Sequence, residues 1–294
     1  MKLRALLLCT LLGWQATAAA GDIIGARPLG MAGSYRGIAS SNDAIFFNPA
    51  GMSLFRRYAL ELQYLLVPDY AAKGAADQHA VQVSVVDNQI QYFATGLAYT
   101  RVERGDDKSG NRYDMAFSVP LTEGLLIGTD IKYLDFEREG RADVNAVSVD
   151  VGMLLHTSFG LNIGVVGYNL TNTADYLEHP ISMGLGVMYS PFRTLELSFD
   201  WTVNFQKLAD IDDPTGEKGT GHAFSFGAEY LLFGQITLRA GYRIDRSQPT
   251  GNEQYWAVGA GYISPTFAFD FGYRGAVGHS DWGNHFGFGM RLFL

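Results

Sequence analysis

Charged side chains at every second position are the residues of this sequence with the clearest potential for chemistry. In residues 195–205, Glu196 and Asp200 alternate with apolar side chains. Residues two apart on a strand point to the same face, so these charges are expected to share one polar face of a sheet. The charges predicted to face the interior of the fold are Glu61, Asp130, Lys132, Asp150, Glu196, Asp200, Glu229, Arg239, Arg243, Asp270, Arg274 and Arg291.

These interior charges are interpreted as structural ion pairs. Acidic residues dominate the earlier segments of the chain, and arginines dominate the last four. If the sheet closes on itself, acidic and basic walls would face each other, or an inner segment, across the interior. Burying a charge is costly unless it is paired, so salt bridges are favoured over an array that binds a substrate.

No pattern typical of a catalytic or metal-binding site accompanies these charges. The histidines lie mostly in or beside predicted loops, and His79 and His222 lack the spacing of metal ligands. Cys9 is the only cysteine and lies in a predicted leader, so thiol catalysis and disulfides are not expected. The formal net charge of −8 disfavours a nucleic-acid partner. The sequence therefore predicts neither an enzyme nor a bound cofactor or metal.

The N-terminus has the features of a secretory signal peptide. Lys2 and Arg4 precede an apolar run over residues 5–14, and small residues follow. A transmembrane anchor would need about 20 apolar residues, and polar side chains break this run. We therefore predict a signal peptide over residues 1–20, cut before Gly21, and export of the rest of the chain.

The exported part alternates apolar and polar residues over many short stretches, which is typical of β-strands with one face in lipid. The alternation predicts an all-β fold with an even number of strands, as single-chain bacterial barrels require. The fourteen predicted strands span residues 58–66, 78–86, 90–103, 112–119, 124–136, 143–156, 160–170, 181–189, 194–206, 222–231, 235–245, 254–263, 266–275 and 284–294.

Connections between these strands are predicted to alternate between short and long, as at residues 264–265 and 207–221. Outer-membrane barrels have short periplasmic turns and longer outer loops, whereas a soluble β-sandwich has no reason to alternate in this way. Aromatic residues, which form girdles at membrane interfaces, make up 13% of the chain. We predict a 14-stranded antiparallel transmembrane barrel in the outer membrane of a Gram-negative bacterium. Its partners would be outer-membrane lipids, lipopolysaccharide and the barrel assembly machinery.

Residues 25–54 precede the first predicted strand and contain glycines, small residues and prolines with little alternation. A barrel of fourteen strands needs an inner plug to avoid a leak, and a free loop need not carry Phe46 and Met52. We therefore predict an N-terminal hatch, residues 21–57, in the lumen of a barrel formed by residues 58–294. The alternative is a loop that merely joins the signal peptide to the first strand.

Local hydrogen bonds are predicted within this hatch. Asn48 before Pro49 favours a turn closed by a side-chain hydrogen bond. Asn42 and Asp43 are expected to cap a short helical turn that continues through Phe46. The residues predicted to form the hatch and to contact a ligand are Asn42, Asp43, Phe46, Phe47, Asn48, Pro49, Ala50, Gly51 and Met52.

Three elements of this segment, residues 26–33, 41–44 and 48–52, resemble the N-terminal hatch of the FadL-like superfamily of outer-membrane proteins. That superfamily includes the long-chain fatty acid transporter, aromatic hydrocarbon channels, and the PorV and PorQ type proteins associated with type IX secretion. The fourteen-strand count extends the resemblance to the whole exported chain.

The resemblance implies a barrel for passive uptake of small hydrophobic molecules, such as long-chain fatty acids or aromatic hydrocarbons. The PorV-like branch implies a different function, in which the barrel anchors or assists a protein secretion or surface-assembly machine and docks a secretion-system partner. Fatty acid transporters build a capture groove from long outer loops, and the loops predicted here are shorter. A hydrophobic pocket beside Phe46, Phe47 and Met52 would favour uptake, whereas a lumen filled with charge pairs would favour anchoring.

Overall fold

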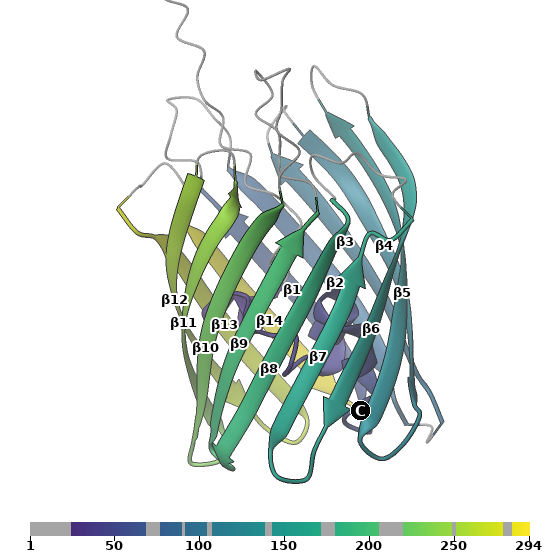
Figure 1. The fold of residues 1–294 in the computed structure, drawn as a ribbon, viewed down its shortest axis with the longest axis vertical. Coiled ribbons are helices and arrows are strands. Elements are labelled where there is room, and N and C mark those ends of the chain that lie inside the picture. The colour runs from purple at the N-terminus through teal and green to yellow at the C-terminus, as the bar shows by residue number, and fades with distance from the viewer. Residues whose placement is uncertain are drawn as a thin grey trace, which may run out of the picture.

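Fourteen antiparallel strands form a closed barrel in the computed structural model of this protein (Figure 1). The structure describes residues 25–68, 77–89, 92–104, 108–138, 143–171, 180–205, 220–248, 251–278 and 284–294. Each strand pairs with the next one in the sequence, and β1 pairs with β14 to complete the ring. The strands are β1 (Tyr58–Val67), β2 (Gln78–Asp87), β3 (Ala94–Arg104), β4 (Lys108–Pro120), β5 (Leu125–Arg138), β6 (Val144–His156), β7 (Leu161–Tyr168), β8 (Ser182–Phe192), β9 (Leu195–Asn204), β10 (Gly221–Leu232), β11 (Ile236–Gln248), β12 (Gly251–Ile263), β13 (Phe267–Ala276) and β14 (His285–Phe293).

The predicted closed barrel of fourteen antiparallel strands is confirmed, and the strand bounds differ from the predicted ones by a few residues. The loop predicted over residues 246–253 is wrong, because β11 extends to Gln248 and β12 begins at Gly251. Gln248 pairs with Gly251 after a register shift, so the ladder of backbone hydrogen bonds continues where polar residues indicated a loop. Short and long connections therefore do not alternate strictly.

Side chains on the strands divide into an inner face rich in polar groups and an apolar outer face. In β9, Asp200 is buried, whereas Leu197 is 44% exposed. A row of tyrosines crosses the outer face of β3, β4 and β5. The ring centroids of Tyr99 and Tyr113 are 5.2 Å apart, and those of Tyr113 and Tyr133 are 6.1 Å apart. Such aromatic pairs on neighbouring strands stabilise the sheet from its outer side.

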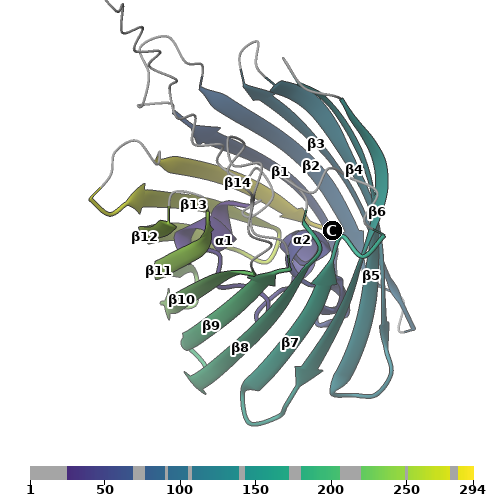
Figure 2. The same cartoon turned by 45° about the horizontal axis from the view of Figure 1, so that its top comes forward.

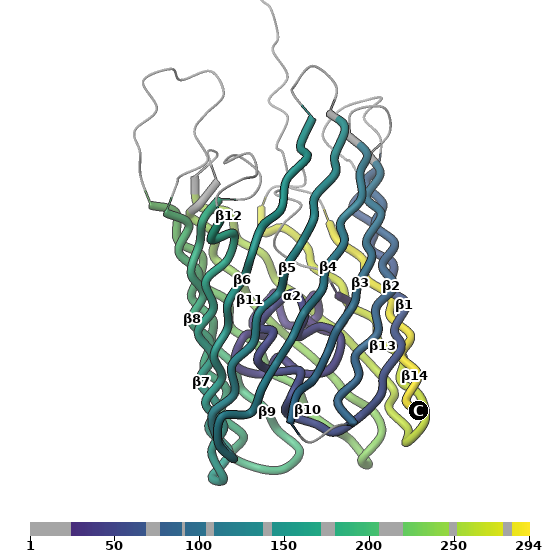
Figure 3. The backbone as a smooth tube through the Cα atoms, turned by 90° about the vertical axis from the view of Figure 1, so that its right-hand side faces the viewer, coloured from purple at the N-terminus to yellow at the C-terminus, as the bar shows by residue number. Residues whose placement is uncertain are grey.

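Residues 25–54, which we call the N-terminal segment, lie inside the barrel (Figure 2 and Figure 3). The segment contains α1 (Ala26–Gly30), η1 (Ser41–Asp43), α2 (Ala44–Phe47) and η2 (Pro49–Ser53). Helix α1 contacts β12, β13 and β14, and η2 contacts β4, β5 and β6. No helix in these described ranges is long and apolar enough to cross a membrane. The predicted signal peptide, residues 1–20, lies outside the described residues.

Glycines in the wall let the segment approach the backbone of the barrel. A Cβ atom added at Gly272 would lie 2.2 Å from the carbonyl oxygen of Ala26, and one added at Gly128 would lie 2.4 Å from the nitrogen of Ala50. Any side chain at these two positions would therefore have to displace the segment. The strand glycines fix where α1 and η2 lie against the wall.

Candidate functional site in the barrel lumen

Asp200 on β9 binds the N-terminal segment through three hydrogen bonds to one carboxylate oxygen. Its Oδ2 accepts the backbone N–H groups of Tyr35 and Arg36 at 3.0 and 2.8 Å, and a guanidinium N–H of Arg36 at 3.1 Å. Both partners are buried, since Asp200 is 1% exposed and Arg36 is 5% exposed. Charge-assisted hydrogen bonds are stronger than neutral ones, so this ion pair ties the middle of the segment firmly to the wall.

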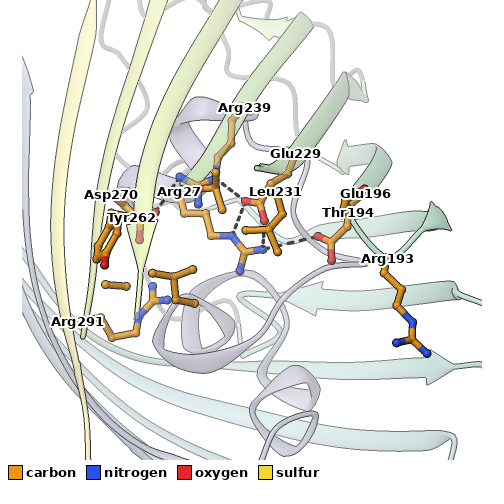
Figure 4. Close-up of a pocket in the computed structure, with 13 residues that line it drawn as sticks. Arg27, Arg193, Thr194, Glu196, Glu229, Leu231, Arg239, Tyr262, Asp270 and Arg291 are labelled. Atoms are coloured by element: carbon orange, nitrogen blue, oxygen red, sulfur yellow. Dashed lines mark hydrogen bonds and ion pairs between the residues drawn. The ribbon is translucent and has the colours of Figure 1, made fainter. Parts of the chain in front are cut away.

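Arg27 in α1 forms a second link to the wall (Figure 4). Its guanidinium donates to both carboxylate oxygens of Glu229 at 2.9 Å, and a carboxylate oxygen of Glu196 lies 3.6 Å away. Arg239 donates to Glu229 and forms an ion pair of 2.7 Å with Asp270. A chain of side chains with alternating negative and positive charge extends from Glu196 on β9 to Asp270 on β13, and it borders a pocket of about 160 Å³. Ion pairs therefore line this part of the lumen.

Asp43 forms a third link, at the seam where β1 meets β14. Its carboxylate accepts hydrogen bonds from Arg291 at 3.1 Å and from the side-chain amide of Gln63 at 3.0 Å. Arg291 also donates to Glu61 at 2.6 Å. Burial raises the pKa of the Asp43 carboxyl, and the Arg291 guanidinium opposes that rise. One guanidinium thus joins the segment to both closing strands of the barrel.

Two local side-chain hydrogen bonds were predicted in the segment, and one of them forms. Asn48 accepts the N–H of Ala50 at 3.2 Å, so the predicted turn is confirmed. The predicted helix cap is wrong, because Asp43 occupies the N-cap position of α2 without a side-chain hydrogen bond to the helix. Asn42 donates instead to Ser84 at 3.0 Å. The side chains of Asn42 and Asp43, which were predicted to cap the helix, form hydrogen bonds with the barrel wall instead.

Residues 44–54 contain no charged side chain and therefore form no ion pair. The guanidinium groups of Arg112 and Arg36 lie over the rings of Phe46 and Phe47, 5.2 and 5.8 Å from the ring centroids. The hydrogen bonds of residues 44–54 with side chains and backbone of the wall satisfy buried polar atoms without forming ion pairs. These hydrogen bonds run from Asn48 Nδ2 to Met153 O at 3.1 Å, from Tyr168 OH to Phe47 O at 2.5 Å, from Ser118 Oγ to Ala50 O at 2.8 Å, and from Ser53 Oγ to Ser118 Oγ at 2.8 Å.

Apolar packing completes the contact between residues 44–54 and the wall. Phe46 is 8% exposed and Phe47 is 3% exposed, and the Phe47 ring meets the Tyr35 ring edge-on at 5.4 Å. Phe46, Phe47 and Met52 therefore pack in a core and do not line the pocket of Figure 4. The members of this apolar core are Met31, Tyr35, Ile38, Ala39, Ala44, Ile45, Phe46, Phe47, Met52, Val86, Ala94, Ala98, Ala116 and Met188.

A second apolar cluster, which we call the upper apolar wall, lies on the inner face near the loop ends of β3, β5 and β6. Its side chains are buried, and they alternate with outward residues along each strand. Sequence alternation predicted only charged residues for the inner face and missed this cluster. The members of the upper apolar wall are Val102, Leu134, Phe136, Val144 and Ala146.

Charged residues of β4, β5 and β6 lie between the two apolar clusters. Lys132 donates to both carboxylate oxygens of Asp150 at 2.7 Å, and Arg112 pairs with Asp114 at 2.6 Å. Asp130 is 0% exposed, and neither of its oxygens has a hydrogen-bond partner in the part of the chain that the structure describes. These pairs join groups of the wall to each other, and the Arg112 guanidinium also lies over the Phe46 ring of the N-terminal segment, 5.2 Å from its centroid.

The structure places the predicted interior charges on the inner face, with Glu196 only partly buried. The ion pairs join a strand to the segment, two strands that lie close together, or two residues of one strand. Wall charges therefore pair with the inner segment, which was one of the two expected arrangements, and the ion pairs named here do not join acidic and basic walls across the lumen. Arg112 and Asp114 were not predicted from the sequence. They are two positions apart, which is the same alternation that identified the other inward charges. Sequence reasoning also missed Arg27 and Arg36, which lie in a segment without periodicity. No metal-binding group of three or more acidic, His or Cys side chains occurs among the residues described.

Several solved structures resemble this barrel over nearly its whole length. The CymD monoaromatic hydrocarbon channel has a TM-score of 0.67 at 13% identity, and the match covers 93% of this chain and 97% of that chain. The Pseudomonas putida toluene transporter TodX has a TM-score of 0.66 at 14% identity, with 93% and 97% covered. A Pseudomonas aeruginosa FadL homologue has a TM-score of 0.64 at 12% identity, with 93% and 98% covered. No protein-family model and no curated protein matches the chain.

At these levels of identity the comparison establishes the fold. The chain has the closed fourteen-stranded barrel of FadL-like hydrocarbon channels, matched over more than nine-tenths of its length. The resemblance expected from residues 26–33, 41–44 and 48–52 is therefore confirmed at the level of the fold.

Proposed function

We propose that this protein is an outer-membrane barrel through which small hydrophobic molecules pass passively, of the fatty acid or aromatic hydrocarbon type. The upper apolar wall carries this proposal, because it places buried apolar side chains on the inner face of the barrel at its loop end. Phe46, Phe47 and Met52, beside which a pocket was expected, pack in a core and do not carry it. An aqueous channel has a polar interior, whereas contact with the upper apolar wall removes the apolar surface of a permeant from water. The fold shared with a monoaromatic hydrocarbon channel and a toluene transporter supports the same function.

The proposed location follows from the outer face of the barrel. Leu97 is 53% exposed and Phe269 is 49% exposed there, and such apolar side chains suit contact with outer-membrane lipids and lipopolysaccharide. The tyrosine row of β3, β4 and β5 would lie at a membrane interface. Export would depend on the predicted signal peptide, residues 1–20, and insertion on the barrel assembly machinery.

The N-terminal segment obstructs the lumen, so passage requires a local opening. Three side chains of residues 25–43, those of Arg27, Arg36 and Asp43, form ion pairs with the wall, and their displacement would leave buried charges unpaired, which is costly. Residues 44–54 are uncharged and pack on small and apolar side chains of the wall. We infer that residues 44–54 shift against the wall during passage while residues 25–43 stay in place.

Uptake of a labelled fatty acid or of toluene by cells tests the function. Uptake should fall when the protein is deleted and return with the wild-type chain. The fully buried Leu134 of the upper apolar wall offers a matched pair of variants. Leu134→Met keeps an apolar side chain of similar volume and should support uptake, whereas Leu134→Gln places an amide on the wall and should reduce it.

Gel migration of the folded barrel before and after heating should be equal for both variants, which separates a loss of function from a loss of folding. Equal uptake by Leu134→Gln and Leu134→Met would contradict a route along the upper apolar wall. Unchanged uptake after deletion, together with capture of a secretion-machine subunit, would favour the anchoring function.

A further inference from the structure

His285, the first residue of β14, has one ring nitrogen whose role is fixed by its neighbour. Its Nε2 lies 2.9 Å from a guanidinium nitrogen of Arg274. Arginine can only donate, so Nε2 accepts and the ring proton is on Nδ1. His285 is 7% exposed, and Nδ1 has no hydrogen-bond partner among the residues that the structure describes. A buried N–H group without an acceptor is destabilising, and such groups are rare in proteins.

The position of His285 in the barrel places this donor beside the N-terminal segment. A Cβ atom at Gly287 would lie 3.0 Å from Cα of Ala26, and one at Gly272 would lie 2.2 Å from O of Ala26. His285 and Arg274 are two residues from these glycines, towards the loop ends of β14 and β13, and share their face. The two side chains are therefore the next inward groups above α1, where a molecule entering from the loop end arrives.

The groups around His285 are aromatic and polar. The Tyr255 ring meets the His285 ring edge-on, with centroids 6.4 Å apart, and the Arg274 guanidinium lies 4.5 Å from the centroid of the Tyr255 ring. Two polar pairs extend from this group along β11 and β12, where Arg243 pairs with Asp245 at 2.7 Å and Tyr255 donates to Glu253 at 2.6 Å.

We propose that Nδ1–H of His285 donates a hydrogen bond to an oxygen atom of the permeant. The inference rests on the proposed function and narrows the substrate class to hydrophobic molecules that carry a neutral acceptor, such as a ketone or an ester. A neutral acceptor satisfies Nδ1 without bringing a further charge into a buried site, whereas a carboxylate brings a charge that is costly to take out of water. A pure hydrocarbon leaves Nδ1 without a partner.

Equilibrium binding of two small aromatic probes to the purified full-length barrel in detergent micelles tests this proposal. Ethylbenzene and acetophenone have similar shapes, but only acetophenone has a carbonyl acceptor. The wild-type chain should bind acetophenone about 2- to 10-fold more tightly, the range expected for one neutral hydrogen bond. Oleate and methyl oleate form a second pair, in which the ester should be preferred if the acceptor must be neutral.

Two variants of His285 separate its two nitrogen atoms. His285→Asn keeps an N–H donor near the position of Nδ1 and should retain the preference for acetophenone. His285→Gln keeps an acceptor near Nε2 for Arg274 but removes the Nδ1 donor, so it should bind both probes with equal affinity. Ethylbenzene has no acceptor, so each variant's own affinity for ethylbenzene is the reference against which its preference for acetophenone is expressed.

Each outcome of the binding experiment has a distinct meaning. Binding of ethylbenzene with no preference for acetophenone in the wild type would overturn the role of His285 and leave the proposed function standing. A preference that survives in His285→Gln would overturn it as well. If the wild type binds neither probe, the proposed function fails and this inference fails with it. A nitrogen NMR spectrum of the imidazole with the proton on Nε2 would contradict the tautomer directly.

Discussion

Residues 25–43 and residues 44–54 are attached to the same barrel wall by different physical means. The first part uses Arg27, Arg36 and Asp43, each in an ion pair with a strand residue. The second part has no charge of its own, and neutral hydrogen bonds, apolar contacts and the stacking of the Arg112 guanidinium on the Phe46 ring attach it to the wall. Separating a buried ion pair leaves a charge uncompensated, whereas an apolar contact can be exchanged for another at lower cost. Residues 25–43 should therefore resist displacement from the wall more strongly than residues 44–54.

Ion pairs within the wall can stay together when the N-terminal segment moves. Lys132 and Asp150 lie on neighbouring strands, and Arg112 and Asp114 lie on one strand. The Arg112 guanidinium also lies over the Phe46 ring, 5.2 Å from its centroid. The ion pairs that hold residues 25–43 in place are therefore those of Arg27, Arg36 and Asp43.

The largest effect is expected for Asp200→Ala. The change leaves the Arg36 guanidinium and two backbone N–H groups without their acceptor, and breaking a buried ion pair costs about 3–5 kcal/mol. Denaturant unfolding in lipid vesicles should show this loss of stability, and hydrogen exchange should increase over residues 25–43. The control is Arg101→Ala, because the Arg101 and Glu103 side chains form an ion pair while 37% and 58% exposed, and its stability should be unchanged. Equal stability of the two variants would show that the buried Asp200–Arg36 ion pair does not hold residues 25–43 to the wall.

A smaller effect is expected for Gly272→Ala, which brings a methyl group to within 2.2 Å of the Ala26 carbonyl oxygen. Forcing extra atoms into a packed contact costs about 1–3 kcal/mol, and α1 should be displaced. The matched control is Gly289→Ala, whose added Cβ would be 3.6 Å from Cβ of Ala26, an ordinary contact. If both variants unfold at the same denaturant concentration, the glycine at position 272 does not position α1.

The smallest effect is expected for Tyr168→Phe. This change removes the hydroxyl that donates to the carbonyl of Phe47 and keeps the ring, whose centroid lies 5.2 Å from the Arg36 guanidinium. One neutral hydrogen bond contributes about 0.5–1.5 kcal/mol. Hydrogen exchange should increase more over residues 44–54 than over residues 25–43. An equal increase over both ranges would show that the segment opens as a single unit.

The barrel could be predicted from the sequence because its physical signal is local. Apolar and polar residues alternate with the period of a strand, as around Asp200, so strand number, closure and the inward direction of the charges follow from neighbouring residues. The extension of β11 to Gln248 could not be predicted, since polar residues pair as readily as apolar ones where a strand continues beyond the lipid.

The contacts of the segment could not be predicted, because they join residues far apart in the sequence. Arg36 and Asp200 are separated by 164 positions, and Arg27 and Glu229 by 202 positions. No periodicity marks either arginine. The role of His285 was missed for the same reason, since it depends on Arg274 across the strand pair.

Two engineered disulfides test whether residues 44–54 move while residues 25–43 stay in place. Cysteines at Ala26 and Gly289 would have Cβ atoms 3.6 Å apart, within the range of about 3.5–4.5 Å found in disulfides. Cysteines at Ser53 and Ser118 would replace hydroxyl oxygens that lie 2.8 Å apart. The first disulfide locks α1 to β14, and the second locks η2 to β4.

Uptake of the hydrophobic probe is measured for both double variants, first oxidised and then reduced. We predict that the oxidised Ser53→Cys/Ser118→Cys variant loses uptake and regains it on reduction. The oxidised Ala26→Cys/Gly289→Cys variant should take up the probe as the wild type does. Loss of uptake in the second variant, or full uptake in the oxidised first variant, would contradict an opening confined to residues 44–54.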